Sequence, residues 1–193
     1  MFRADTIIFM DLIDKNTAYT VNKDAFGRVR IWSLNPDRSF DKLIFDKPNL
    51  ITNQGADIAA RALSGQPYTS ISHIYAGYNN TGSVPSVAVT DTITVFNTYA
   101  RVPLTFSPSY SNESGYSNNL VYFTVYLTGT TSPGAATTTV PNGYDIVELG
   151  LVNATSTNPS NDNLFSHIAF SPITYNSTYG LAITWGLTFR AQS

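Results

Sequence analysis

The sequence predicts an all-β fold: a jelly-roll-like β-sandwich with one short helix and a charged N-terminal β extension. Apolar and polar residues alternate along several segments, turns rich in Gly, Pro and Asn separate them, and one stretch alone has helical spacing. Alternation with a period of two is typical of half-buried strands. Many short strands joined by turn-rich connections are typical of sandwiches. At 193 residues, the chain is long enough for one domain with its own core.

The clearest strands are predicted at 120–128 and 181–190. In the second of these, Leu181, Ile183, Trp185, Leu187 and Phe189 alternate with small or polar residues. Shorter strands are predicted at Thr6–Leu12, Arg28–Leu34, Leu43–Phe45, Ile71–Gly77, Arg101–Phe106, Tyr144–Val152 and Leu164–Phe170. Two polar stretches, 107–119 and 129–142, are predicted to be long loops.

One helix is predicted near residues 53–63. Thr52 or Asn53 is a suitable N-cap, and Gly65 stands where a left-handed residue commonly ends a helix. Ile58, Ala59, Ala62 and Leu63 share one face of this helix, and we expect that face to pack on the sheet.

Charge is distributed very unevenly along the chain. Residues 1–61 hold nine Lys/Arg and eight Asp, which is 17 of the 24 charged side chains. We therefore divide the chain into a charged N-terminal β extension or docking segment, 1–47, and a sandwich body, 48–193. The candidate docking residues are Arg28, Arg30, Arg38, Lys42 and Lys47. A weakly charged body suits permanent contact with other proteins better than a free existence in solution.

Composition also sets expectations about partners and location. The formal net charge of −2, with no basic patch in either zone, argues against nucleic acid as the main partner. The apolar run from Ile7 to Met10 is too short for a signal peptide or a membrane span, so we expect a soluble product of the cytoplasm and no membrane partner.

Few residues are candidates for chemistry. The chain has no cysteine, and His73 and His167 lie in strand patterns without partners at metal-ligand spacing, so both are interpreted as structural. Asp145 and Glu148 would point to opposite faces of a strand unless a bulge intervenes, and Glu148 is expected to be hydrogen-bonded at a strand edge or to a turn. The stretch 158–163 could supply oxygen ligands to Ca²⁺, but a polar turn is favoured. We therefore expect no catalytic residues, no metal, no cofactor and no enzymatic activity.

Tyrosines beside Ser, Asn and Gly suggest a recognition surface. The candidates are Tyr75, Tyr78, Tyr99, Tyr110, Tyr116, Tyr122 and Tyr126, of which the last four are the predicted interface residues. Such a surface could bind protein or sugar. Ordinary strand preference explains the tyrosines equally well.

A series of short motifs runs in order from residue 49 to residue 189. It includes Asn49-Leu-Ile-Thr-Asn-Gln-Gly-Ala-Asp-Ile-Ala-Ala, Ile71-Ser-His-Ile-Tyr-Ala-Gly, Asp91-Thr, Asn97-Thr-Tyr-Ala-Arg101, Val147-Glu-Leu-Gly-Leu-Val-Asn-Ala, Leu164-Phe, Phe170-Ser-Pro-Ile and Leu181-Ala-Ile-Thr-Trp-Gly-Leu-Thr-Phe. In this order the motifs resemble a loosely defined group of tailed-bacteriophage virion structural proteins. The sequence departs from the group at Thr98, where the group usually has a glutamate.

The resemblance implies a virion structural protein, made in the host cytoplasm and located in the virion. Within that class, we predict a capsid decoration (cement) protein that binds the outer shell, with other virion proteins as partners, above all the major capsid protein. A homo-oligomer is expected, because closed symmetric assemblies are the commonest state. The alternatives are a tail, neck or fibre component and, from another class, a carbohydrate-binding module that uses exposed tyrosines.

Overall fold

The computed structural model describes residues 27–104, 112–117, 120–130, 138–154 and 158–188. For residues 112–117, 120 and 188 it describes the backbone alone. The strand predicted at Thr6–Leu12 and the interface residue Tyr110 lie outside the described residues.

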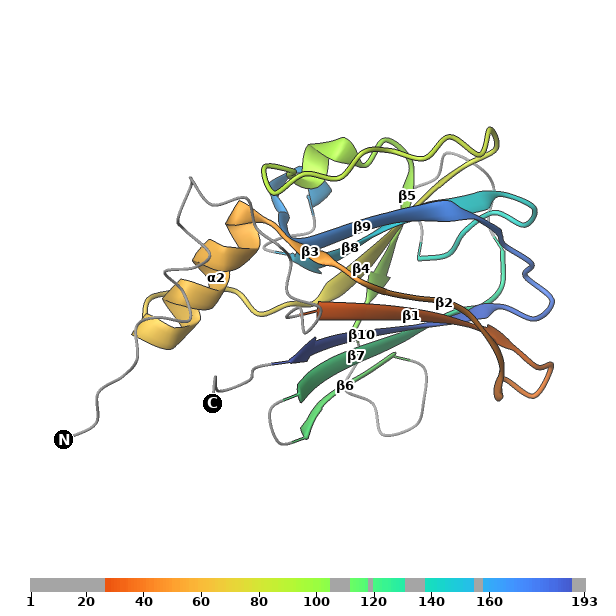
Figure 1. Ribbon diagram of the computed structural model, residues 1–193, viewed down its shortest axis with the longest axis horizontal. Helices are drawn as coiled ribbons and strands as arrows, with labels where there is room; N and C mark the ends of the chain where they lie inside the picture. Colours follow the sequence, from red (N-terminus) through yellow and green to blue (C-terminus); the bar gives the residue numbers. More distant parts are fainter. Residues whose placement is uncertain (1–26, 105–111, 118–119, 131–137, 155–157, 189–193) are drawn as a thin grey trace.

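The described chain forms two antiparallel sheets that pack face to face (Figure 1). The first sheet has the order β2 (Phe40–Pro48), β1 (Gly27–Leu34), β10 (Leu181–Thr188), β7 (Leu120–Leu127), β6 (Asn112–Ser117). The second has the order β3 (Leu50–Ile51), β9 (Asn163–Thr174), β8 (Asp145–Asn153), β4 (His73–Asn79), β5 (Tyr99–Pro103). The all-β sandwich class is therefore confirmed, whereas its jelly-roll connectivity is not.

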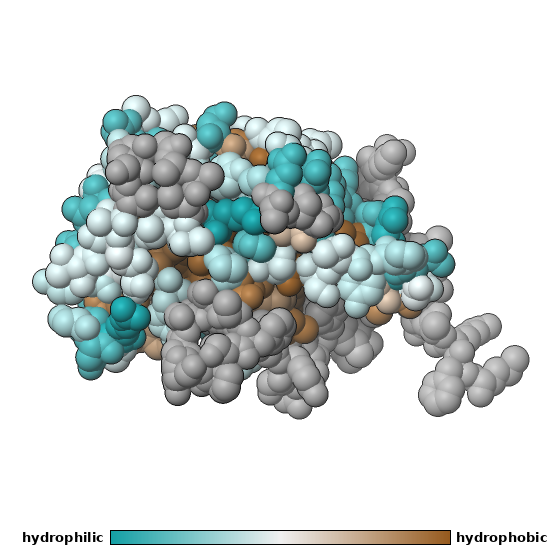
Figure 2. Space-filling view, turned by 180° about the vertical axis from the view of Figure 1, so that it is seen from behind, coloured by the Kyte–Doolittle hydropathy of each residue, from teal (hydrophilic) through white to brown (hydrophobic). Residues whose placement is uncertain are grey.

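The core between the sheets consists of the alternating apolar residues that define the strands. From the first sheet, Phe123, Val125 and Leu127 of β7 meet Ile183 and Trp185 of β10, as the period-two pattern predicted. From the second sheet come Ile74, Leu149, Leu151 and Ile168. Figure 2, seen from behind, shows apolar residues along the middle of the molecule between more hydrophilic ones.

The predicted helix is present as α2 (Asn53–Ser64). Thr52 caps it by accepting a hydrogen bond from the Gly55 amide, and Gly65 ends it with φ 69°. Ile58 and Ala59 pack against the core as predicted. Leu63 is 73% exposed and Ala62 is also exposed, so the prediction for that half of the face was wrong. The reason is visible in Figure 1, where α2 projects from one end of the sandwich and only its first turns reach the sheets.

Several predicted boundaries need correction. The stretch 107–119 is not one long loop, because it contains β6, which pairs with β7. β5 begins at Tyr99 and ends at Pro103, earlier than the predicted 101–106, and β9 continues to Thr174. Among the described residues, no helix has both the length and the apolar character that a membrane span requires.

The charged segment from Gly27 to Pro48 contributes two strands to the first sheet. β1 pairs with β10 from Gly27 to Ser33, and β2 forms the edge of the sheet beside β1. Residues 27–47 of the charged N-terminal segment are therefore part of the sandwich. For the rest of that segment, the division of the chain into 1–47 and 48–193 stays a prediction.

Candidate functional site

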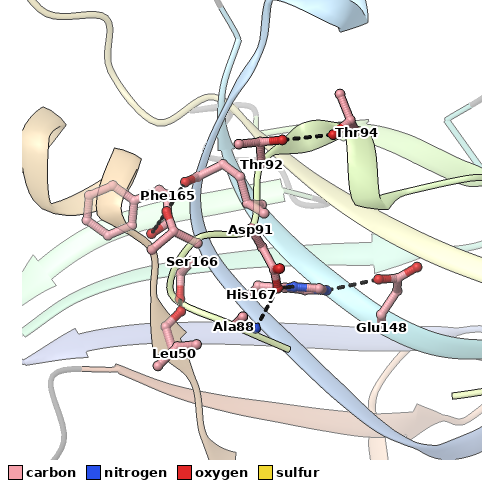
Figure 3. Close-up of polar contacts among 11 residues, drawn as sticks. Leu50, Ala88, Asp91, Thr92, Thr94, Glu148, Phe165, Ser166 and His167 are labelled. Atoms are coloured by element: carbon pink, nitrogen blue, oxygen red, sulfur yellow. Dashed lines mark hydrogen bonds and ion pairs between the residues drawn. The ribbon is translucent and has the colours of Figure 1, made fainter. Parts of the chain in front are cut away.

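The outer face of the second sheet holds a buried cluster of three ionisable side chains, which we call the His167 cluster: Asp91, Glu148 and His167. His167 lies on β9, Glu148 on the neighbouring β8, and Asp91 on the segment 80–98 that links β4 to β5. His167 Nδ1 is 2.8 Å from Asp91 Oδ2, and His167 Nε2 is 2.9 Å from Glu148 Oε2. Figure 3 shows the imidazole between the two carboxylates, with one at each ring nitrogen.

This geometry favours the charged form of the imidazole. His167 is fully buried, and burial lowers its pKa, but the hydrogen bonds and negative charges of Glu148 and Asp91 outweigh this effect and raise the pKa above its ordinary value. An ionised carboxylate can only accept, so each ring nitrogen must donate. The doubly protonated imidazolium is the form that satisfies both bonds.

Gly77 leaves room for the side chain of Glu148, and a hydrogen bond within the segment 80–98 orients the carboxylate of Asp91. A Cβ on Gly77, which pairs with Glu148 across β4 and β8, would lie 2.3 Å from Glu148 Cγ, so only glycine leaves room for that side chain. Asp91 Oδ2 also accepts a hydrogen bond from the Ala88 amide at 2.7 Å. The ring of Phe96 lies 5.2 Å from the imidazole, centroid to centroid, and helps to exclude water.

The arrangement of the cluster determines what it can do chemically. Both ring nitrogens are already bonded to protein, so neither is free to take a proton from a substrate. Among the described residues, no group of three His, Asp or Glu side chains could hold a metal ion. Sequence reasoning expected Glu148 at a strand edge or a turn; instead it lies on a central strand and binds a histidine. Asp145 binds elsewhere, accepting from the Thr174 hydroxyl at 2.6 Å.

A second polar network lies on the same sheet. The Tyr75 hydroxyl donates to Asp162 Oδ2 at 2.5 Å, and Arg101 Nε donates to the same oxygen at 3.0 Å. Asp162 follows the short helix η2 (Pro159–Asn161), so the polar turn predicted at 158–163 is anchored to the sheet by its own carboxylate. Tyr75 is fully buried and stacks on Tyr99, with ring centroids 4.3 Å apart. Tyr75 is therefore not part of an exposed recognition surface.

The outer face of the first sheet is a different kind of surface, and we call it the arginine–aromatic face. It comprises three rows across β1, β10 and β7: Arg28–Gly186–Tyr122, Arg30–Thr184–Thr124 and Trp32–Ala182–Tyr126. From β2, Phe40 reaches over the third row, with its ring centroid 5.5 Å from that of Trp32 and 6.3 Å from that of Tyr126. Phe40 remains 49% exposed.

Charge on this face is paired at one end. Asp46 of β2 forms ion pairs with Arg28 and with Arg30, the latter at 3.5 Å. The hydrogen bond from Arg28 lowers the pKa of Asp46, and the same bond raises the pKa of Arg28. The arginines themselves are exposed, so the face combines partly neutralised arginines with an aromatic row.

The structure brings together four of the nine predicted interface residues on this face: Arg28, Arg30, Tyr122 and Tyr126. Arg38 lies in the turn between β1 and β2, where its φ is 67°. Lys42 is exposed on the edge strand β2, and Lys47 lines a shallow groove of about 380 Å³ between β2 and β9. Tyr110 and the side chain of Tyr116 lie outside the described residues. Whether any of these nine binds a partner stays a prediction.

Sequence reasoning missed the apolar members of the face. Trp32 continues the alternation of Arg28 and Arg30, which was a usable signal, because every second residue of a strand shares a face. Phe40 gave no such signal, since a register shift in the pairing of β1 with β2 interrupts the alternation there.

Comparison with known proteins adds no assignment: no protein-family model matches the chain, and neither a curated protein nor a solved structure matches it significantly.

Proposed function

We propose that this protein is a non-catalytic structural component of a tailed-phage virion, specifically a capsid decoration protein that binds the outer shell. The motif series from residue 49 supports the virion class. The arginine–aromatic face is the observation that supports docking on the shell through this surface. Tyr, Trp, Phe and Arg are the residue types enriched in the buried centres of protein interfaces.

The composition of the face favours a protein partner. Exposed Phe40 stands between Trp32 and Tyr126, and the paired Arg28 and Arg30 lie along one margin. An apolar centre supplies affinity, while charges at the margin select the partner. The major capsid protein is the proposed partner, and a homo-oligomer on the shell is the proposed state.

Copy number tests the decoration role. Quantitative mass spectrometry of purified particles should find tens to hundreds of copies per virion, and electron cryomicroscopy should place them on the head. One or a few copies on the tail axis would replace this proposal with the tail, neck or fibre alternative.

Substitution tests the docking face. Phe40→Ala should weaken binding to capsids that lack the protein by about 30-fold, which corresponds to a typical aromatic hot spot of about 2 kcal/mol. Leu63→Ala is the matched control, because Leu63 is more exposed but lies on α2 at the end of the molecule. If both variants bind these capsids equally well, the arginine–aromatic face is not the docking surface.

A sugar ligand is the second candidate, because neighbouring aromatic rings on a sheet also suit stacking against a pyranose. Glycan-array binding that disappears in Phe40→Ala, together with no capsid binding, would favour it over the decoration role.

A further inference from the structure

The segment that links β4 to β5, residues 80–98, crosses the outer face of the second sheet, and we call it the strap (Figure 1). Most of its side chains are exposed, including Val84 and Val89. Ile93 and Phe96 are buried, and they pack with Tyr75, Val152 and Leu164 in a small apolar cluster apart from the main core. This limited burial makes the strap a candidate for local opening.

Polar contacts hold the middle of the strap, and Asp91 is central to them. Its Oδ2 accepts from the Ala88 amide within the strap and from His167 Nδ1 on the sheet (Figure 3). Close by, the Val89 carbonyl accepts from the Asn53 amide at the start of α2. His167 is thus the sheet residue that Asp91 binds, and it is itself held from the other side by Glu148.

The bond between Asp91 and His167 depends on a proton. If His167 loses one proton, one ring nitrogen becomes an acceptor that faces a carboxylate oxygen at 2.8 or 2.9 Å in a buried site. Two acceptors cannot bond, and water does not reach the ring to compensate. The neutral imidazole can keep only one of its two partners.

The surroundings of His167 leave these two carboxylates as the groups that control it. Asp91 faces it from the strap and Glu148 from β8, while Phe96 of the strap presents an aromatic ring. Its paired neighbours on β3 and β8 are Leu50 and Gly150. Among the described residues, Asp91 and Glu148 are the charged groups in contact with the ring.

We propose that the second proton on His167 holds the strap against the second sheet, and that its loss lets the strap open while the rest of the sandwich stays folded. Opening separates Ile93 and Phe96 from the sheet residues of the small apolar cluster and breaks the contact between Val89 and α2. This inference does not rest on the proposed function.

The direction of the pH effect follows from linkage. An open strap leaves His167 with Glu148 alone, whereas in the closed cluster both carboxylates raise the pKa of His167, so this pKa is lower in the open state than in the closed state. The closed strap is therefore fully stabilised below the pKa of His167 in the open state, and the ratio of closed to open molecules falls by up to about tenfold per pH unit above it, until the raised pKa of the closed state is reached.

Hydrogen exchange followed by mass spectrometry between pH 6 and pH 10 measures this ratio. After correction for the intrinsic pH dependence of exchange, strap peptides should exchange faster as the pH rises above the pKa of His167 in the open state, by up to about tenfold per pH unit. Peptides of β7 and β10 should keep their protection. NMR of the histidine ring in the same samples should show His167 losing a proton over the range in which the strap opens.

Two variants test whether the bond between Asp91 and His167 causes the pH dependence of strap opening. Asp91→Ala should open the strap at every pH and remove the pH-dependent step. Asp57→Ala is the matched control, because it removes an exposed carboxylate on α2 that pairs with Arg61, and it should leave the strap profile unchanged.

The proposal fails if strap exchange in the wild-type protein does not depend on pH after correction. It also fails if His167 stays protonated until the whole sandwich unfolds, or if Asp91→Ala leaves the strap as protected as in the wild-type protein. Should Asp91→Ala not fold, the two wild-type measurements alone decide.

Discussion

Replacing Gly77 with alanine should break the hydrogen bond between Glu148 and His167 from the opposite strand. The new Cβ would lie 2.3 Å from Glu148 Cγ and 2.6 Å from its Oε1, closer than real Cβ contacts allow. The backbone of Gly77 does not have positive φ, so an alanine there is not strained by its own conformation. The glutamate side chain must move, and its carboxylate loses its place opposite His167 Nε2.

The size of the effect combines two contributions. Overpacking a filled site costs about 1–3 kcal/mol, and losing a hydrogen bond to a charged group costs about 1.5–3 kcal/mol. We therefore expect Gly77→Ala to lower the free energy of unfolding by about 2.5–6 kcal/mol at pH 6. Urea denaturation followed by tryptophan fluorescence measures it.

Gly150→Ala provides a matched control on the next strand. Its Cβ would lie 2.7 Å from Leu164 Cδ1 and 2.8 Å from Phe96 Cζ, so it overpacks apolar atoms without touching a carboxylate. Its loss should be about 1–3 kcal/mol and should depend less on pH than that of Gly77→Ala, because it displaces Phe96 but leaves both carboxylates in place. The excess loss of Gly77→Ala should shrink as the pH rises through the raised pKa of His167, because the wild-type protein loses the same stabilisation there. If the excess is absent, or stays constant from pH 6 to pH 10, the hydrogen bond between Glu148 and His167 does not contribute to stability as expected.

Three further substitutions test other parts of the structure by denaturation. Thr52→Ala should lower the free energy of unfolding by about 1–2 kcal/mol, because the Thr52 hydroxyl accepts from the Gly55 amide and donates to the Leu164 carbonyl. Thr52→Ser keeps a hydroxyl and should retain most of this stability. Tyr75→Phe should cost about 1.5–3 kcal/mol by removing a donor from buried Asp162, and an unchanged stability would mean that Arg101 alone satisfies that carboxylate. Asp57→Ala should change stability by less than about 0.5 kcal/mol, since the pair with Arg61 is exposed; a larger loss would indicate a role beyond that pair.

The strands were predictable because their pattern is local. Alternation in β7 and β10 identified the core residues, since one face of each strand carries large apolar residues and the other carries small or polar residues and tyrosines. Pairing partners were not predictable, because they depend on contacts between distant segments. β6 was missed because the polar residues 112–117 show no apolar alternation. The helix was predicted correctly, but the exposure of Leu63 depends on where the sandwich ends, which the helix sequence does not contain.

The His167 cluster could not be found by spacing. Its members stand at positions 91, 148 and 167, and they meet only because β8 pairs with β9 in one register, with Gly150 opposite His167, and the strap crosses both strands. One clue was present in the sequence: a glutamate within the apolar strand 144–152 needs a buried partner. The arginine–aromatic face was partly predictable, because Arg28, Arg30 and Trp32 alternate, whereas Phe40 joins them through an irregular pairing.

The uneven charge distribution has a structural counterpart. Beyond residue 61 the chain has seven charged side chains: Asp91, Arg101, Glu113, Asp145, Glu148, Asp162 and Arg190. Four of the seven belong to the two internal networks on the second sheet, around His167 and around Tyr75. Buried charges must be paired: buried Glu148 binds His167 and buried Asp162 binds Arg101, while Asp91 and Arg101 are partly buried. Hence the few charges of the body mainly hold a strap and a turn to a sheet, and much of its surface is left to Ser, Thr and Asn. A surface of that kind has weak repulsion between copies, which favours the dense packing that the proposed decoration role requires.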